Sequence, residues 1–155
     1  MTNLLKQFAK ISFALAALVH LPVYADDDND GNNKPCSLAT LAGRYSFVES
    51  GFILGLAPSP LPAADVGTFS SDGLGGMTGG GETLTVAGRV VTDTFSNGTY
   101  TVSADCTGTA SWTATLSNGQ QSARTVSFSV AGNGKEIFVL STQPGTVLSG
   151  VAHKQ

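Results

Sequence analysis

The most constraining feature of this chain is a two-residue alternation of apolar and hydroxyl-bearing side chains through most of its length. In the segment 107–116, Trp112 and Ala114 fall on one face of an extended chain, and Ser111 and Thr113 fall on the other. Successive side chains of a β-strand point to opposite faces, so this pattern predicts strands with one apolar face and one polar face. No segment after residue 42 keeps a helical period.

Turn-forming residues divide this alternation into short strands. Gly, Asn, Asp and Pro interrupt it about every ten residues. We expect strands at 44–50, 66–71, 76–86, 89–95, 99–104, 107–116, 123–131, 136–142 and 146–153. The pairs Asp72-Gly73, Asn97-Gly98 and Asn118-Gly119 favour tight hairpin turns because both residues of such a pair tolerate positive φ. A short helix is expected at 37–42, capped by Ser37.

A row of consecutive hairpins forms an antiparallel meander, and the meander must hide its apolar face. The sequence therefore predicts an all-β domain, a single antiparallel up-and-down β-barrel of about eight strands. Closing the sheet also removes the unpaired edges that promote aggregation. A two-sheet β-sandwich is the alternative fold.

The N-terminal residues have the three parts of a secretory signal peptide. Lys6 and Lys10 precede an apolar stretch at 11–23, and Val23-Tyr24-Ala25 offers a cleavage site. We expect residues 1–25 to be a signal peptide, 26–36 an acidic disordered tail and 37–155 the barrel domain. The protein is then exported to the periplasm or the extracellular space. An uncleaved membrane anchor is the alternative, although the apolar stretch is shorter than the roughly 20 residues that span a bilayer.

The charge of the chain after residue 25 argues against two classes of partner. Six Lys and Arg residues stand against eleven Asp and Glu, a net charge of −5. Nucleic-acid binding needs basic patches, and docking on anionic lipid needs basic clusters. We therefore expect no nucleic-acid partner, and no membrane association after cleavage. The sequence does not predict an oligomeric state.

The chain has two cysteines, Cys36 and Cys106. In an oxidising compartment we expect a disulfide between them, with two free thiols as the alternative. His153 is the one histidine after residue 25, which disfavours both Cys–His catalysis and a zinc site. We expect no cofactor and no metal.

Three motifs resemble functional signatures only in part. The segment 26–31 (DDDNDG) begins like a calcium loop, but Ser37 stands at the twelfth position, where such a loop needs a Glu. The Gly-rich run 73–81 lacks the Gly-Lys-Ser/Thr of a phosphate-binding loop. Asn97-Gly98-Thr99 matches a glycosylation acceptor, which we interpret as a turn.

Three segments, 67–73 (GTFSSDG), 98–109 (GTYTVSADCTGT) and 145–150 (GTVLSG), resemble a pattern of small exported bacterial proteins of uncharacterised function. Those proteins are similar to lipocalin-like and allene-oxide-cyclase-like barrels. The resemblance implies an eight-stranded antiparallel barrel with an apolar interior. It carries over no catalytic residue, because no enzyme motif matches residue by residue.

The inward faces of the predicted strands supply candidate ligand-binding residues. Tyr45, Phe47 and Glu49 share one face of the first strand, and Trp112 and Phe128 lie on the apolar faces of two others. If Glu49 points inward, burial raises its pKa and suits it to acid–base chemistry or to holding a ligand. The alternative is an exposed position at the rim. The Pro-rich segment 52–62 is either a lid or a surface loop.

Three functions are compatible with such a chain. We expect a non-catalytic exported barrel that binds a small apolar ligand, rather than an enzyme. The first alternative is a cyclase or isomerase of the allene-oxide-cyclase type, assisted by Glu49 or Tyr45. The second alternative is a structural or surface protein with a filled barrel, since an eight-stranded barrel either packs its interior or holds one ligand.

Overall fold

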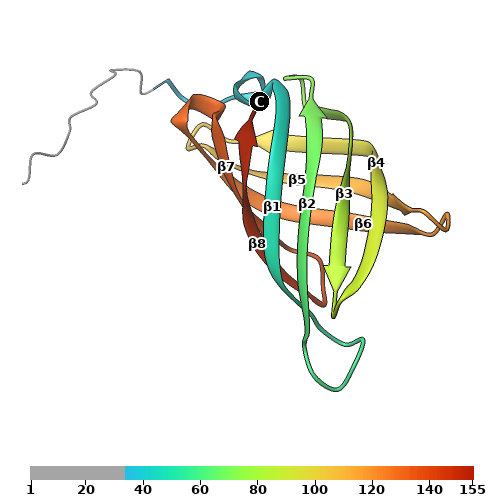
Figure 1. Ribbon diagram of the computed structural model, residues 1–155. Helices are drawn as coiled ribbons and strands as arrows, with labels where there is room; N and C mark the ends of the chain where they lie inside the picture. Colours follow the sequence, from blue (N-terminus) through green and yellow to red (C-terminus); the bar gives the residue numbers. More distant parts are fainter. Residues whose placement is uncertain (1–33) are drawn as a thin grey trace, which may run out of the picture. The chain divides into compact units, whose positions relative to one another are not determined.

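The computed structural model describes residues 34–155, which form a closed antiparallel β-barrel (Figure 1). Each strand pairs with the next in the sequence, and the last pairs with the first. The strands are β1 (Gly43–Ile53), β2 (Leu61–Ser71), β3 (Gly76–Val86), β4 (Arg89–Val102), β5 (Thr107–Leu116), β6 (Gln121–Ala131), β7 (Glu136–Ser141) and β8 (Thr146–Lys154). Two 3₁₀ helices, η1 (Leu38–Leu41) and η2 (Gly132–Gly134), complete the domain.

The up-and-down barrel predicted from the sequence is confirmed, and the sandwich alternative is wrong. Nine residues of β1 pair with β8, from Tyr45 opposite Lys154 to Ile53 opposite Thr146, so the sheet has no free edge. The predicted signal peptide and the predicted tail before residue 34 lie outside the described residues. Within residues 34–155, no helix is long and apolar enough to cross a bilayer.

The structure has eight strands rather than the nine expected, because Asn97-Gly98 is not a hairpin turn. These two residues form a bulge within β4, between Ser96 and Thr99, where Asn97 adopts a φ of 53°. In a regular strand, two residues an odd number of positions apart point to opposite faces. The extra residue in the bulge changes this, so side chains five positions apart on either side of it both face inward. Phe95 and Tyr100 are both buried. A bulge and a tight turn use the same left-handed conformation, so the dipeptide alone did not distinguish them.

Other turns occupy their predicted places. Asp72 Oδ1 accepts hydrogen bonds from the backbone N–H groups of Leu74 (2.7 Å) and Gly76 (2.9 Å) in the β2–β3 turn. Asn118 Oδ1 does the same for Gln120 at 2.9 Å in the β5–β6 turn. These side-chain acceptors fix the chain reversals locally.

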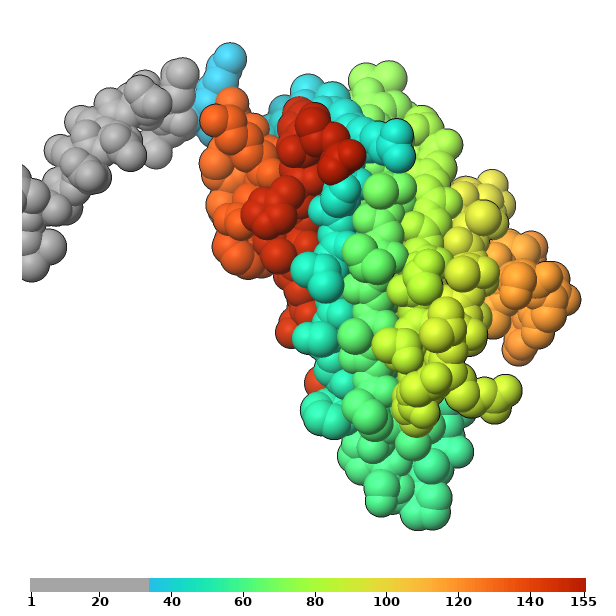
Figure 2. Space-filling model, in the orientation of Figure 1, coloured from blue at the N-terminus to red at the C-terminus, as the bar shows by residue number. Residues whose placement is uncertain are grey.

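The Pro-rich segment between the first two strands is partly sheet. Phe52 and Ile53 end β1, and Leu61 and Pro62 begin β2. The exposed residues 54–60 between them project past the end of the barrel (Figure 2). The exposure of all seven residues is typical of a surface loop.

The interior of the barrel has three layers along its axis. An aromatic layer near η1 is built around Tyr45, Phe47 and Phe95. A small aliphatic layer of Ala63, Leu84 and Leu148, with Ile53 and Val86 packed against it, fills the opposite end. Between the two layers the inward positions of β1 to β4 carry acidic side chains, namely Glu49, Asp65, Glu82 and Asp93.

The helix η1 closes one end of the barrel. Leu41 is buried in the aromatic layer, and its carbonyl accepts a hydrogen bond from the Ser71 hydroxyl. Tyr100 Oη donates to the carbonyl of Leu38 at 3.0 Å. The predicted disulfide is confirmed, since Cys36 bonds to Cys106 just before η1 begins. Two hydroxyls and one covalent bond thus hold this plug on the barrel.

The outer face of the barrel follows the predicted alternation on one side only. On β4 to β6 most outer side chains carry hydroxyl groups, and some of these hydrogen-bond across strands, as in Thr101 with Thr109 at 3.0 Å. On β7, β1 and β2 the outer positions include exposed Phe138, Val48 and Val66. The short strand β7 is apolar on both faces, so the expectation of one hydroxyl-rich face per strand is wrong there.

Removing the disulfide should loosen the η1 plug. We expect replacement of both Cys36 and Cys106 by Ser to lower the free energy of unfolding by about 2–4 kcal/mol, because the bridge closes a long loop in the unfolded chain. Urea denaturation measures this change. The reduced wild-type protein is the control and should behave like the double variant; an unchanged urea midpoint in both would contradict the prediction.

Large inward rings lie against glycines on the neighbouring strand. A Cβ at Gly67 would come within 2.6 Å of the Phe47 ring and 2.4 Å of the Gly81 carbonyl. Gly108 meets the Phe128 ring in the same way, at 2.4 Å. Glycine at these positions lets the rings lie flat on the wall of a narrow barrel.

We expect Gly67→Ala to lower the free energy of unfolding by about 1–3 kcal/mol, because the added methyl displaces Phe47 and a backbone carbonyl. Thermal denaturation with circular dichroism measures the change. Ser70→Ala, an outward position of the same strand, is the control and should change it by less than about 0.5 kcal/mol. Equal effects of the two substitutions would contradict this packing argument.

Candidate functional site

The candidate site is the barrel interior, which contains two adjoining cavities. The larger has a volume of about 60 Å³ and lies within the aromatic layer. The smaller has a volume of about 30 Å³ and lies in the acidic layer. Glu49, Trp112 and Val126 line both cavities, so these side chains form the boundary between them.

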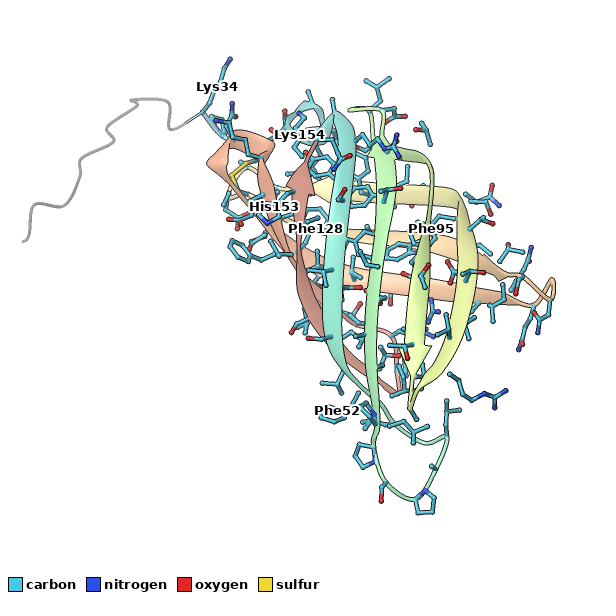
Figure 3. All side chains as sticks on the ribbon, viewed as in Figure 1. Lys34, Phe52, Phe95, Phe128, His153 and Lys154 are labelled. Carbon is cyan, nitrogen blue, oxygen red and sulfur yellow. A yellow bond between two sulfur atoms is a disulfide. The ribbon has the colours of Figure 1, made fainter. Side chains whose placement is uncertain are left out.

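Six aromatic side chains line the larger cavity. Phe47 and Phe95 stack with ring centroids 6.2 Å apart, and Phe95 and Trp112 lie 5.4 Å apart at 50°. Figure 3 shows Phe95 and Phe128 within the barrel. Met77 adds an unbranched, adaptable side chain to the wall. The cavity therefore suits a hydrocarbon group.

Four of the five predicted ligand-binding residues line this cavity. They are Phe47, Glu49, Trp112 and Phe128. Tyr45 faces inward but is not part of the cavity wall. It is fully buried, stacks on Phe69 at 5.1 Å and donates its hydroxyl to the carbonyl of Gly134 at 2.7 Å. Burial raises the pKa of Tyr45 to about 12, so it remains a hydrogen-bond donor.

Sequence reasoning missed the rest of the acidic layer. Asp65, Glu82 and Asp93 are buried, and they face Glu49 and Arg124 inside the barrel. The alternation of side chains did indicate their inward position. Each acidic residue stands two positions from a buried apolar residue of its own strand, and residues two apart share a face. Asp93 precedes Phe95 in this way, and Glu82 precedes Leu84. Extending the inward face through charged residues would have found them.

The strand register brings the four carboxyl groups together in two pairs. Glu49 on β1 lies directly opposite Asp65 on β2. Glu82 on β3 lies directly opposite Asp93 on β4. Like charges directly opposite each other destabilise a sheet, and burial strengthens their repulsion. The layer therefore favours a state in which some of these groups are protonated or bound to a cation.

Arg124 on β6 is the cation of this layer. Its Nη2 lies 3.8 Å from Glu82 Oε1 and 3.8 Å from Asp93 Oδ2. Its Nη1 donates to Gln143 Oε1 at 3.4 Å. These contacts are long for charge-assisted hydrogen bonds, which are about 2.8 Å. One loosely placed guanidinium thus offsets only part of the charge of four carboxyl groups.

Burial raises the pKa of every carboxyl group in the layer. For Glu49 it raises the pKa to about 7, helped by the charge of Asp65 and opposed by Arg124. For Asp65 burial raises the pKa to about 6, opposed by a backbone hydrogen bond from Glu49 and by Arg124. For Glu82 burial and the charge of Asp93 raise the pKa, and for Asp93 burial raises it.

Several polar atoms of the layer have no hydrogen-bond partner. Among the acceptors these are Glu49 Oε1, Asp65 Oδ1 and Asp93 Oδ1, and among the donors Trp112 Nε1 and Arg124 Nε. The three carboxyl side chains belong to residues that are at most 9 % exposed. An unpartnered buried polar group costs about 1–3 kcal/mol, and more when it is charged. Such a cost is characteristic of binding and catalytic sites.

The acidic layer is not arranged as a metal site. In the part of the chain that the structure describes, no group of three His, Cys, Asp or Glu side chains is placed to hold a metal ion. The calcium-like segment 26–31 lies outside the described residues. Comparison of the chain with protein-family models, with curated proteins and with solved structures finds no match.

The acidic layer should make the folded protein less stable as the pH rises. Glu49 titrates near 4.5 when unperturbed but at about 7 in the fold, so over this interval the unfolded chain releases a proton that the folded chain keeps. We expect the free energy of unfolding to fall between about pH 4.5 and pH 8, with Glu49 alone contributing about 3 kcal/mol. Urea denaturation across this range measures the slope.

The variant Glu49→Gln should flatten this slope and be more stable than the wild type at about pH 8. Ser127→Ala, on the outward face of β6, is the control and should keep the wild-type slope, because it removes no titratable group. A wild-type stability that rises from about pH 4.5 to pH 8 would show that the layer is not buried in solution.

Proposed function

We propose that this protein binds a small, mainly apolar molecule inside its barrel and does not catalyse a reaction. The proposal rests on one observation: a buried carboxyl group lies in the wall of an apolar cavity. Glu49 is part of the aromatic wall, and its Oε1 lacks a partner. Binding sites commonly combine an apolar wall with a few polar groups that orient the ligand.

We also propose that the protein works outside the cytoplasm. The disulfide between Cys36 and Cys106 supports this location, because such bonds persist in oxidising compartments. The lipocalin-like resemblance seen in the sequence is compatible with export and with ligand binding in a barrel, and it stays a proposal.

A filled barrel with a structural role is the second candidate, and the small cavity volume favours it. The cavity of about 60 Å³ is well below the roughly 150 Å³ that holds benzene in an engineered protein core. Against this candidate stands the acidic layer, since a barrel that only needed packing would be more stable with apolar residues there. A ligand of this protein must therefore be very small, or must displace a side chain such as Met77.

A cyclase or isomerase is the third candidate, and the inward position of Glu49 favours it. A carboxyl group with a pKa of about 7 suits general acid–base catalysis. Tyr45, the other residue considered for catalysis, is not part of the cavity wall, and its hydroxyl donates a hydrogen bond to the carbonyl of Gly134. It is therefore not positioned to act on a substrate in the cavity. With Glu49 alone, we favour binding over catalysis.

The fluorescence of Trp112 tests the binding proposal, because it is the one tryptophan of the chain and lines both cavities. We expect straight-chain alcohols to change its emission saturably. Affinity should rise about fourfold per added CH₂ group up to about butan-1-ol and then level off when the cavity is full. Absence of saturation with every alcohol would favour the filled barrel.

A matched pair of variants separates cavity binding from solvent effects. Ala110→Leu fills the cavity from its wall and should abolish saturable binding. Ser111→Leu adds a similar group on the outward face of the same strand and should leave the affinity unchanged. Circular dichroism checks that both variants fold. Equal affinities in the two variants would place the alcohol outside the barrel.

A further inference from the structure

We propose that the ligand is a small aliphatic ammonium ion, with its charged group between Glu49 and Asp65 and its hydrocarbon chain in the aromatic cavity. This inference rests on the proposed binding function and specifies the class of ligand. It is drawn from three observations: the distribution of charge in the acidic layer, the unpartnered carboxylate oxygens, and the way in which the two cavities adjoin.

The charge of the acidic layer is unevenly compensated. Arg124 lies within ion-pair distance of Glu82 and Asp93, at 3.8 Å from each. Within residues 34–155, Glu49 and Asp65 have no Lys, Arg or His nitrogen within 4.0 Å. The β3–β4 side of the layer thus has a cation, and the β1–β2 side lacks one. A bound cation would offset the charge on that side.

The unpartnered carboxylate oxygens indicate that the bound cation carries hydrogen-bond donors. Glu49 Oε1 and Asp65 Oδ1 are buried acceptors without donors. The two residues are cross-strand partners, so their Cβ atoms lie about 5 Å apart and one ammonium group can contact both carboxylates. An ammonium group supplies three donors and a positive charge. A metal ion fits less well, because no three such ligands converge in the part of the chain that the structure describes.

The adjoining cavities fix the shape of the ligand. The smaller cavity, of about 30 Å³, contains Glu49 and Asp65 and suits the charged group. The larger cavity, of about 60 Å³, begins at the shared Glu49 and Trp112 and suits a chain of a few carbon atoms. The faces of aromatic rings also favour the partly charged methylene next to an ammonium nitrogen. The site therefore selects a primary alkylamine over a neutral molecule of the same length.

Three probes with the same four-carbon chain test this selectivity, namely n-butylamine, butan-1-ol and butanoate. We expect Trp112 fluorescence and isothermal titration calorimetry to give a dissociation constant for n-butylamine at least about tenfold lower than for butan-1-ol at about pH 8. The preference should disappear at about pH 5, where the amine stays charged but the carboxyl groups are protonated. The groups that face Glu49 in this titration are Asp65, Glu82, Asp93 and Arg124.

Variants assign the preference to the proposed carboxyl groups. Glu49→Gln and Asp65→Asn should each remove the preference for n-butylamine over butan-1-ol at about pH 8. Both replace a buried charge by a neutral group and should fold. Glu136→Gln, outside the interior, should keep the full preference.

The outcomes distinguish this inference from the proposed function. Equal affinity for n-butylamine and butan-1-ol overturns the ammonium inference and leaves the binding function standing. Tighter binding of butanoate also overturns it, and assigns the ligand to Arg124 Nε and Trp112 Nε1, the unpartnered donors of the site. Failure of all three probes to bind overturns both proposals.

Discussion

The pairing of β8 with β1 is the contact on which the rest of this protein depends. It closes the sheet, so every inward side chain faces another inward side chain rather than water. A closed sheet of this size has a narrow interior, which explains why large rings alternate with inward glycines such as Gly67 and Gly108. Closure also gives the inward carboxyl groups their low-dielectric surroundings.

Because the barrel is closed, the order of its interior layers determines how far the acidic side chains are from solvent. The acidic layer lies between an aromatic layer under η1 and an aliphatic layer at the opposite end. Its groups are therefore shielded from solvent along the barrel axis as well as by the wall. Arg124 offsets part of their charge, but burial, the largest cause, still raises the pKa values of Glu49 and Asp65. A ligand cation and protonation are two ways to relieve the same electrostatic cost.

The interior predicted from the sequence was correct where alternation was unbroken. The rings of Phe47, Trp112 and Phe128 were placed correctly because side-chain direction in a regular strand has a strict period of two. The bulge at Asn97 was missed, because the same dipeptide suits a hairpin turn. The position of Tyr45 outside the cavity was also missed, since its hydroxyl partner is the carbonyl of Gly134, a residue distant in the sequence.

The sequence by itself determined the local properties of this protein: strands with an apolar face, the turns at Asp72 and Asn118, and a cysteine pair suited to a disulfide. These follow from backbone preferences and side-chain period, which act over a few residues. The tertiary structure alone decided that four carboxyl groups share one interior layer with Arg124 and that Glu49 lies beside an apolar cavity. Those relations depend on the register between strands and on closure of the sheet, which join residues that the linear chain keeps apart.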